Sequence, residues 1–310
     1  IINFTYQIFK KIKNINFKII YAHDNCGILL GSLMSKILGK PLIARIYGWS
    51  YMRRSGGKIN LINKIKYWDK YLPIKIKSDL CIITKDGSVS LKELEQINYV
   101  NNNIKLLYNG YDNNFISKRL LKKKSQKTLI SISGLSGWKN VDIVIKIFHL
   151  INIREPGWKL YIIGDGSDKR KLKDLVSNLG LSDKVIFTGR IKKNEVFKYL
   201  KKSDFFINLY DRQTLSNTLW EAMQMGKCVI TRHDSPQINE VIENNLNGYL
   251  FFLDDLESIA KSVIRISKDQ EKLLIIGENA QKTIKDLLPT WGERVDKEIS
   301  MIKHVYSQNV

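Results

Sequence analysis

Short apolar runs of strand length recur along the first third of the chain, and segments with apolar residues at helical spacing separate them. The runs show little of the polar alternation that marks a half-buried strand. Continuous apolar strands separated by helices are typical of a parallel sheet covered on both faces, as in a Rossmann-like domain. We expect its strands at residues 17–23, 41–48, 79–85 and 105–110, and its helices at residues 27–39, 61–72 and 90–97.

The same alternation starts again after a basic stretch, residues 118–127, which has no core pattern and is interpreted as a linker. The pattern predicts a second, fuller doubly wound sheet, in which helices end at glycine or polar residues. Its strands are expected at residues 128–133, 158–164, 184–189, 205–210, 228–232 and 248–252, with the clearest helices at 141–153, 169–180 and 195–203.

The order of strands in such a sheet makes a geometric prediction. In the common order, the first and fourth strands are neighbours, and ligands bind beyond their carboxyl ends. The loop after the first strand, which carries Lys139, should therefore meet the loop after the fourth strand. That second loop opens a helix at Ser216, Asn217 and Thr218, with Glu221 one turn further in.

A helix start of this kind can bind an anion. The unpaired N–H groups of a first helical turn and the positive end of the helix dipole favour a phosphate. With Lys139 across the crevice, a diphosphate would be held from two sides. Glu221 would accept hydrogen bonds from hydroxyl groups of the same ligand.

Composition narrows the class of protein. With 310 residues, 44% of them apolar and 26% charged, the chain can form two globular domains with sizeable cores. No apolar run approaches the length of about 18 residues that indicates a membrane span. Cys26, Cys81 and Cys228 lie far apart without metal-binding spacing, which suits a reducing compartment and argues against a zinc site or disulfides. We expect all three to be buried thiols.

The formal net charge of +21 would draw the protein towards anionic membranes, nucleotides or nucleic acid. Lysines occur almost everywhere, so a general drift of composition would explain the excess as well. Residues 64–77, however, interleave lysines with aromatic residues as interfacial segments do, which predicts peripheral contact with an anionic membrane. Binding to nucleic acid is not expected, because no recognition signature is present.

Seven motifs follow one another along the chain: LYNGYD at 107–112, GLSGWKNVD at 134–142, YIIGDGSDKRKL at 161–172, KVIFTGRI at 184–191 with YLKKSDFFINLY at 199–210, LWEAMQMGKCVIT at 219–231, NEVIENNLNGYLF at 239–251 and TWGERVD at 290–296. In sequence and in order they resemble the landmarks of the retaining glycosyltransferases of family 4. The resemblance implies the GT-B fold, with two facing Rossmann-like domains. It divides the chain into an amino-terminal domain at 1–122, a nucleotide-sugar-binding domain at 123–288 and a final helix at 289–310 that returns to the first domain.

The resemblance implies roles for the charged residues of the second domain. The family has two acids separated by seven residues, of which the second falls on Glu221 and is expected to hold the ribose hydroxyls. Gln213 occupies the position of the first, so it can hydrogen-bond the transferred sugar but brings no charge. Lys139 matches the family's lysine, whereas Gly134 stands where an arginine is usual. With one cation fewer, either turnover would be slower or another base would replace that arginine: Arg190, Arg212 or Arg232.

Further donor contacts are implied by position. The loop and helix start that bind the donor contain Leu215, Ser216, Asn217 and Thr218. Ile191, which follows Arg190, lies where backbone atoms of the family's members contact the nucleotide base. Gly164 and Gly166 form either a plain turn or a nucleotide contact. His23 falls at the family's sugar-facing histidine, although it could equally be structural. Trp49 and Trp138 would stack on a sugar or pack within the protein.

The implied reaction is transfer of a hexose from a nucleotide diphosphate sugar, with UDP-sugar favoured over GDP-sugar, to a glycan or lipid-linked acceptor. The anomeric configuration would be retained, and no cofactor or metal is expected, in keeping with the lack of a DxD motif. Lys139 and the helix start would stabilise charge on the leaving diphosphate. We expect a cytoplasmic enzyme, peripheral on the inner face of the plasma membrane, in cell-surface polysaccharide synthesis.

Two other hypotheses stay open at this point. The altered positions Gln213 and Gly134 would also suit a non-catalytic member that binds a nucleotide or a partner protein at the membrane. A GT-B epimerase is the other alternative. The family's first strand and glycine-rich loop have no counterpart before Ile1, so we expect the amino-terminal domain to be incomplete.

Overall fold

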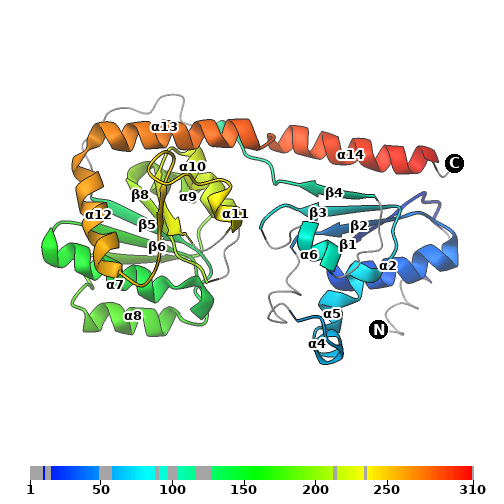
Figure 1. The fold of residues 1–310 in the computed structure, drawn as a ribbon, viewed down its shortest axis with the longest axis horizontal. Coiled ribbons are helices and arrows are strands. Elements are labelled where there is room, and N and C mark those ends of the chain that lie inside the picture. The colour runs from blue at the N-terminus through cyan, green and yellow to red at the C-terminus, as the bar shows by residue number, and fades with distance from the viewer. Residues whose placement is uncertain are drawn as a thin grey trace. The chain divides into compact units, whose positions relative to one another are not determined.

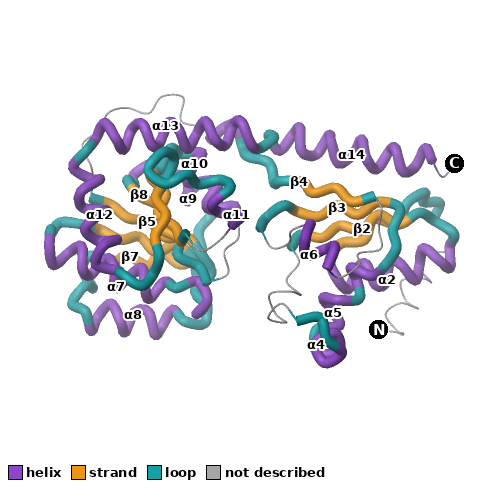
Figure 2. The backbone as a smooth tube through the Cα atoms, in the orientation of Figure 1, coloured by secondary structure: helices purple, strands orange, loops and turns teal. Residues whose placement is uncertain are grey.

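A computed structural model of the chain describes residues 10, 15–48, 58–87, 91–96, 103–115, 127–211, 215–233 and 236–308. The chain divides into two compact units, of which the first combines Ile1–Gly110 with Trp291–Val310 and the second is Tyr111–Thr290. Each unit has its own parallel sheet with helices around it (Figures 1 and 2). The boundary expected at residue 122 falls in 116–126, outside the described residues, and Tyr111 to Phe115 group with the second unit.

The sheet of the first unit has the order β1-β2-β3-β4, and all of its pairs are parallel. Three strands form within predicted strand segments, and β4 begins one residue before its predicted segment, 105–110. Its elements are β1 (Ile20–His23), α2 (Asp24–Leu38), β2 (Leu42–Ile46), α4 (Leu61–Lys66), α5 (Trp68–Tyr71), the 3₁₀ turn η1 (Pro73–Lys75), β3 (Leu80–Thr84), α6 (Leu91–Gln96), β4 (Ile104–Leu107) and α14 (Trp291–Gln308).

Helices cover both faces of this sheet, which explains why β2 and β3 are buried at every position. On one face, Ala44 and Cys81 belong to a core that includes Ile28 of α2. On the other face, Ile43 and Ile82 pack against α14, and Figure 1 shows α2 and α14 on opposite sides of the strands. The last helix of the chain thus completes the core of the first unit.

One helix prediction was wrong in detail. The single helix expected at residues 61–72 is two short helices, α4 and α5, because the backbone of Tyr67 leaves the helical region with φ −117° and ψ 34°. Tyr67 and Tyr71 pack against the core of the unit. The helix expected at 27–39 ends as predicted, with Gly39 in the left-handed region at φ 61°.

The sheet of the second unit has six parallel strands in the order β10-β9-β8-β5-β6-β7. The expected adjacency of its first and fourth strands, β5 and β8, is confirmed. Its elements are η2 (Asn113–Phe115), β5 (Thr128–Ile132), η3 (Gly137–Lys139), α7 (Val141–Arg154), β6 (Lys159–Ile163), α8 (Lys169–Asn178), β7 (Val185–Gly189), α9 (Lys193–Lys202), β8 (Phe205–Asn208), α10 (Asn217–Gln224), β9 (Cys228–Arg232), α11 (Pro236–Asn239), β10 (Tyr249–Phe251), α12 (Leu256–Lys268) and α13 (Gln270–Leu287).

A large core lies between one face of this sheet and helices α7, α8 and α12. Phe148 of α7, Phe205 of β8 and Val263 of α12 are fully buried in it. Helices α9 and α10 contact β5, β8 and β9, and α13 packs against α10 and α12. The strand order and the two helical layers place the carboxyl ends of β5 and β8 side by side.

Two further observations concern the expectations from composition. Cys81 and Cys228 are buried, but the prediction for Cys26 was wrong, because it lies on an exposed face of α2. Among the described residues, no helix is both long enough and apolar enough to cross a bilayer.

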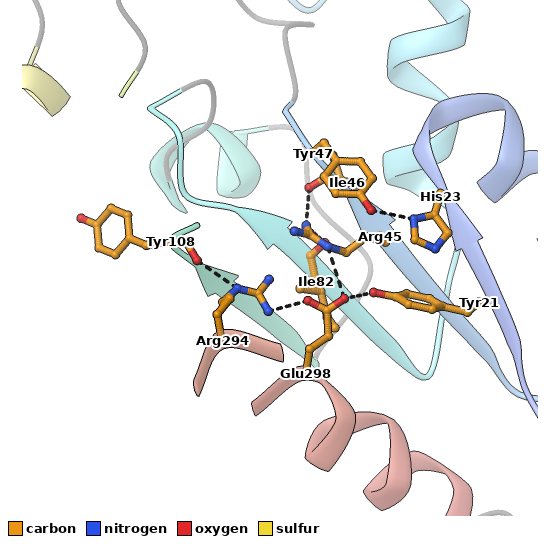
Figure 3. Close-up of polar contacts among 9 residues, drawn as sticks. All are labelled: Tyr21, His23, Arg45, Ile46, Tyr47, Ile82, Tyr108, Arg294 and Glu298. Atoms are coloured by element: carbon orange, nitrogen blue, oxygen red, sulfur yellow. Dashed lines mark hydrogen bonds and ion pairs between the residues drawn. The ribbon is translucent and has the colours of Figure 1, made fainter. Parts of the chain in front are cut away.

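A buried group of charges joins α14 to the sheet of the first unit (Figure 3). Arg45 of β2 and Arg294 of α14 are each 3% exposed, and both contact the Glu298 carboxylate, Arg45 through Nε at 3.5 Å. Tyr21 of β1 donates a hydrogen bond to the same carboxylate, and Arg294 donates to the carbonyl of Tyr108 at 2.9 Å. One carboxylate therefore neutralises two guanidinium groups in part.

Removing that carboxylate should loosen α14. In Glu298→Ala, two buried cations lose their counter-charge, which should lower the free energy of unfolding by about 3–5 kcal/mol. Urea unfolding with hydrogen exchange of the α14 amides measures the effect. Asp296→Ala removes an exposed carboxylate of the same helix and should change stability by less than about 0.5 kcal/mol. Equal stability of the two variants would contradict this account.

Candidate active site

The loop after β5 and the loop after β8 contact each other, as the strand order predicted. Asn140 is 8% exposed, and its backbone lies in the left-handed region at φ 51°. Its side-chain amide donates to the Leu209 carbonyl at 2.9 Å and to Asp211 Oδ1 at 2.6 Å. In return, the Asp211 N–H donates to the Trp138 carbonyl at 2.9 Å. These bonds fix the turn that carries Lys139 beside the carboxyl end of β8.

The Lys139 ammonium lies against two aromatic rings. Its Nζ is 3.6 Å from the ring centroid of Tyr210 and 3.8 Å from that of Trp138. Aromatic faces attract a cation, and the attraction is strongest where water is excluded. Burial lowers the pKa of Lys139 to about 8. The side chain is therefore a partly desolvated cation held in one place, and Trp138, expected either to stack on a sugar or to pack, packs here.

Tyr210 links this lysine to the start of α10. Its hydroxyl donates to the Ile132 carbonyl at 2.8 Å, and the Thr218 hydroxyl lies close enough to lower its pKa against the larger effect of burial. Burial raises the pKa of Tyr210 to about 12, so the phenol stays neutral near pH 7. One buried ring thus contacts the cation on its face and has its hydroxyl near the helix start.

The start of α10 forms where the sequence indicated, with Ser216 as its N-cap at φ −70° and ψ 150°. Ser216 Oγ accepts from the Leu219 N–H at 3.3 Å and lies 3.1 Å from Thr218 Oγ1. Such a cap leaves the remaining N–H groups of the first turn directed out of the helix. Leu215 is 2% exposed, so a donor contact there would come from its backbone.

Glu221 lies one turn into α10 and meets a residue that sequence reasoning missed. Its Oε1 is 3.8 Å from Nζ of Lys193, the first residue of α9. Burial raises the pKa of Glu221, and the charge of Lys193 opposes this shift. The contact brings the loop after β7, which carries Arg190 and Ile191, next to the acid that is predicted to hold the ribose. The donor roles of these residues stay predictions.

Gly164 and Gly166 have a structural reason of their own. Leu135 donates to the Asp165 carbonyl at 3.0 Å, which draws the loop after β6 against the loop after β5. A Cβ atom on Gly164 would lie 1.8 Å from the Ser133 carbonyl oxygen, and one on Gly166 would lie 2.2 Å from that of Leu135. Both positions need glycine because two backbones touch there. A nucleotide contact is not required to explain either residue.

The arginines that could replace the family's second cation differ in their surroundings. Arg232 pairs with Asp211 at 2.8 Å and so joins the group around Asn140. Arg190 is exposed, and its charge helps to lower the pKa of Asp165 after the larger effect of Lys169. Around Gly134 itself, the nearest atom to an added Cβ would be 3.9 Å away, so the backbone leaves room for a side chain.

Three residues of the sequence prediction, Gln213, Arg212 and Trp49, lie outside the described residues. His23 belongs to the first unit, where its Nδ1 lies 2.8 Å from the Tyr47 hydroxyl and its ring stacks on that of Tyr47. It is exposed at the carboxyl end of β1. Its sugar-facing role stays a prediction.

Sequence reasoning also missed Tyr210, Asn140 and Asp211. Tyr210 closes an apolar run that the pattern assigned wholly to a strand, although β8 ends at Asn208. A tyrosine has an apolar ring and a polar tip, and at the end of a buried strand it could have been recognised as a residue that needs a hydrogen-bond partner. Asn140 carried a weaker signal, since asparagine tolerates the left-handed conformation before a helix.

The model of the family Glycosyl transferases group 1 matches residues 112–283, more than half of the chain. The chain belongs to this family. Among curated relatives, it is 30% identical over 73% of its length to the N-acetyl-alpha-D-glucosaminyl L-malate synthase of Bacillus anthracis, of which it covers 59%. It is 23% identical over 97% of its length to the UDP-Gal:alpha-D-GlcNAc-diphosphoundecaprenol alpha-1,3-galactosyltransferase of Escherichia coli, of which it covers 78%. An uncharacterized glycosyltransferase of Haemophilus influenzae, 27% identical over 67% of the chain, is likewise covered over 59% of its length.

Solved structures share the fold over nearly the whole chain. Anabaena Alr3699/HepE in complex with UDP covers 96% of this chain with a TM-score of 0.77 at 18% identity, and the match covers 82% of HepE. A sucrose-phosphate synthase from Thermosynechococcus elongatus covers 98% at a TM-score of 0.77 and 14% identity, over 78% of its own length. The prediction of a GT-B glycosyltransferase fold is confirmed.

The close approach at Gly166 generates a test of its structural role. Gly166→Ala should force apart the loops after β5 and β6 and lower the free energy of unfolding by about 1–3 kcal/mol, as overpacking does. Thermal unfolding measures the loss. Gly137→Ala is the matched control, because the nearest atom to its Cβ would be Asp168 Oδ2 at 3.7 Å, an ordinary contact. If Gly166→Ala melted like Gly137→Ala, the glycine would have to be explained by ligand contact.

Proposed function

We propose that this protein is a retaining, metal-independent glycosyltransferase that moves a hexose from a UDP-sugar to a glycan or lipid-linked acceptor. One observation carries the proposal within a chain of this family. A partly desolvated ammonium, Lys139, and a capped helix start, at Ser216, are held together at the carboxyl ends of adjacent strands. That edge of a doubly wound sheet is where such folds bind their ligands.

Transfer of the sugar requires that charge on the leaving diphosphate be stabilised. As the bond between the sugar and the phosphate oxygen lengthens, negative charge grows on the diphosphate. A cation and helix N–H groups already in position stabilise it without reorganising. Lys139 meets this requirement because the rings of Trp138 and Tyr210, together with its own loop, hold its ammonium group in place before the donor arrives. Its partial desolvation strengthens the attraction to an anion.

Other residues at or near α10 are assigned to the remaining parts of the sugar donor. We assign the ribose hydroxyls to Glu221, whose carboxylate accepts hydrogen bonds and lies near Lys193. We assign a hydroxyl of the transferred sugar to Gln213, which offers both a donor and an acceptor without charge. Arg232, which Asp211 holds beside the Lys139 loop, is the residue that we propose as the second cation for the diphosphate.

The relatives support the choice of donor and acceptor. HepE has been solved with UDP and with UDP-glucose, and the E. coli relative is named for UDP-Gal and for an acceptor on diphosphoundecaprenol. Other relatives are named alpha-monoglucosyldiacylglycerol synthase, after a lipid that carries a glucosyl group. We therefore propose a UDP-sugar as donor, a lipid-linked glycan or lipid as acceptor, and a role in cell-surface polysaccharide synthesis on the cytoplasmic side of the membrane.

A donor assay tests the proposal directly. The protein, incubated with UDP-glucose, UDP-galactose or UDP-N-acetylglucosamine and a lipid extract, should release UDP and label a lipid product. Affinity for UDP without release of UDP or change of the donor would favour a non-catalytic member of the family. Conversion of the donor sugar without an acceptor would favour an epimerase. Failure to bind UDP or any of the three donors would overturn the proposed function.

The pKa of Lys139 predicts how donor affinity depends on pH. The diphosphate attracts the ammonium form, which predominates below a pKa of about 8 and is lost as the pH rises through that value. Affinity for UDP-glucose should therefore be constant from pH 6.5 to 7.5 and then fall by up to about tenfold per pH unit. Calorimetric titration between pH 6.5 and 9.5 measures it. Tyr210, with its pKa near 12, does not titrate in this range.

Two variants complete this test. Lys139→Gln should bind UDP-glucose about 10 to 100 times more weakly, as expected for the loss of a charged hydrogen bond, and should lose the pH dependence above 7.5. Lys173→Gln removes an exposed charge on α8 of the same unit and should keep both the affinity and its pH dependence. A pH profile that survived in Lys139→Gln would show that another group titrates.

A further inference from the structure

A row of large apolar side chains lies exposed along α4 and α5 of the first unit and at the residue that follows α5. They are Leu61, Ile62, Ile65, Trp68 and Leu72, and their exposed fractions lie between 43% and 74%. Leu61 and Ile65 are four residues apart on α4 and so share one side of that helix, while Trp68 begins α5 after the break at Tyr67 and Leu72 directly follows α5. Large apolar residues gathered in this way on a protein surface mark an interaction site rather than a random scatter.

Other residues in and between α4 and α5 attach this segment to the first unit, and the apolar row stays exposed. Tyr67 and Tyr71 pack against the core, and α5 contacts α2 and η1. Lysines lie over the same two rings: Lys66 Nζ is 5.3 Å from the Tyr67 centroid, and Lys64 Nζ is 5.3 Å from that of Tyr71. The tyrosines therefore fix the segment from within, and two lysines of α4 hold their ammonium groups over the tyrosine rings.

The charge around the row selects the partner. Residues 58–77 contain six lysines and one acid, Asp69, whose Oδ2 lies 3.1 Å from Lys70 Nζ. The core of a protein interface is depleted in lysine, so this composition does not suit a protein partner. Leucine, isoleucine and tryptophan bordered by lysines are the composition of helices that lie in the headgroup region of anionic membranes. There the apolar chains enter the acyl boundary, and the ammonium groups meet lipid phosphates.

We propose that α4 and α5 form the membrane-contact surface of this protein, with Leu61, Ile62, Ile65, Trp68 and Leu72 inserted at the surface of an anionic bilayer. This surface would keep the enzyme near a lipid-linked acceptor, and in that respect the inference rests on the proposed function. The six lysines of residues 58–77, part of the basic excess of the chain, thereby acquire a role beside an exposed apolar row.

Vesicle binding by the full chain tests the proposal. Sedimentation with vesicles of phosphatidylglycerol and phosphatidylcholine should carry the protein down, whereas vesicles of phosphatidylcholine alone should bind it weakly. The double variant Ile62→Gln, Ile65→Gln should partition about tenfold less into the anionic vesicles because it loses apolar insertion. Lys64→Gln, Lys66→Gln should lose about fivefold per lysine, and this loss should shrink at high salt.

The control variant is Ile153→Gln, which removes an isoleucine that is 62% exposed on α7 of the second unit and should bind vesicles like the unaltered chain. Equal partitioning of the Ile62, Ile65 variant and this control would overturn the proposal. So would equal binding to neutral and anionic vesicles. UDP-glucose affinity, measured on the same samples without lipid, separates the two hypotheses, because loss of membrane binding should leave it unchanged.

Discussion

The contact between Asn140 and the loop after β8 is the interaction on which the candidate site depends. Two adjacent parallel strands bring their loops near each other, but only specific hydrogen bonds hold them in one register. Asn140 supplies these bonds from a left-handed backbone position, to Leu209 and to Asp211. The turn before it can then present Lys139 to the ring of Tyr210. Without this contact, the lysine would be one of many surface cations.

The site relies on few charges that are well placed. Tyr210 touches Lys139 with its face and reaches towards Thr218 with its hydroxyl, so cation and helix start share one rigid support. A cation in a partly dry environment attracts a phosphate more strongly than one in water, because the effective dielectric constant is lower. This gives a physical reason why the chain could work with Gly134 in place of the family's arginine, with Arg232 held nearby by Asp211.

The first unit uses charge in two opposite ways. In the first unit, Arg45 and Arg294 are buried around Glu298, where they attach the last helix to the sheet and are shielded from solvent. In α4 and α5 of the same unit, lysines lie at the surface beside an exposed apolar row. A buried guanidinium needs a fixed counter-charge, whereas a surface ammonium can find one in a partner. The first kind serves folding, and the second suits a membrane surface.

The sequence by itself determined the parallel α/β architecture, the adjacency of β5 and β8, and the start of α10 at Ser216, because apolar periodicity, strand order and capping residues are local or topological signals. It could not show that residue 166 must be glycine because the backbone of Leu135 touches it. Nor could it show that Tyr210 contacts Lys139, or that Lys193 lies beside Glu221. It also missed the break at Tyr67. The contacts of Gly166, Tyr210 and Lys193 join residues far apart in the chain. Only tertiary packing brings such residues within the few ångströms over which hydrogen bonds, ring contacts and steric exclusion act.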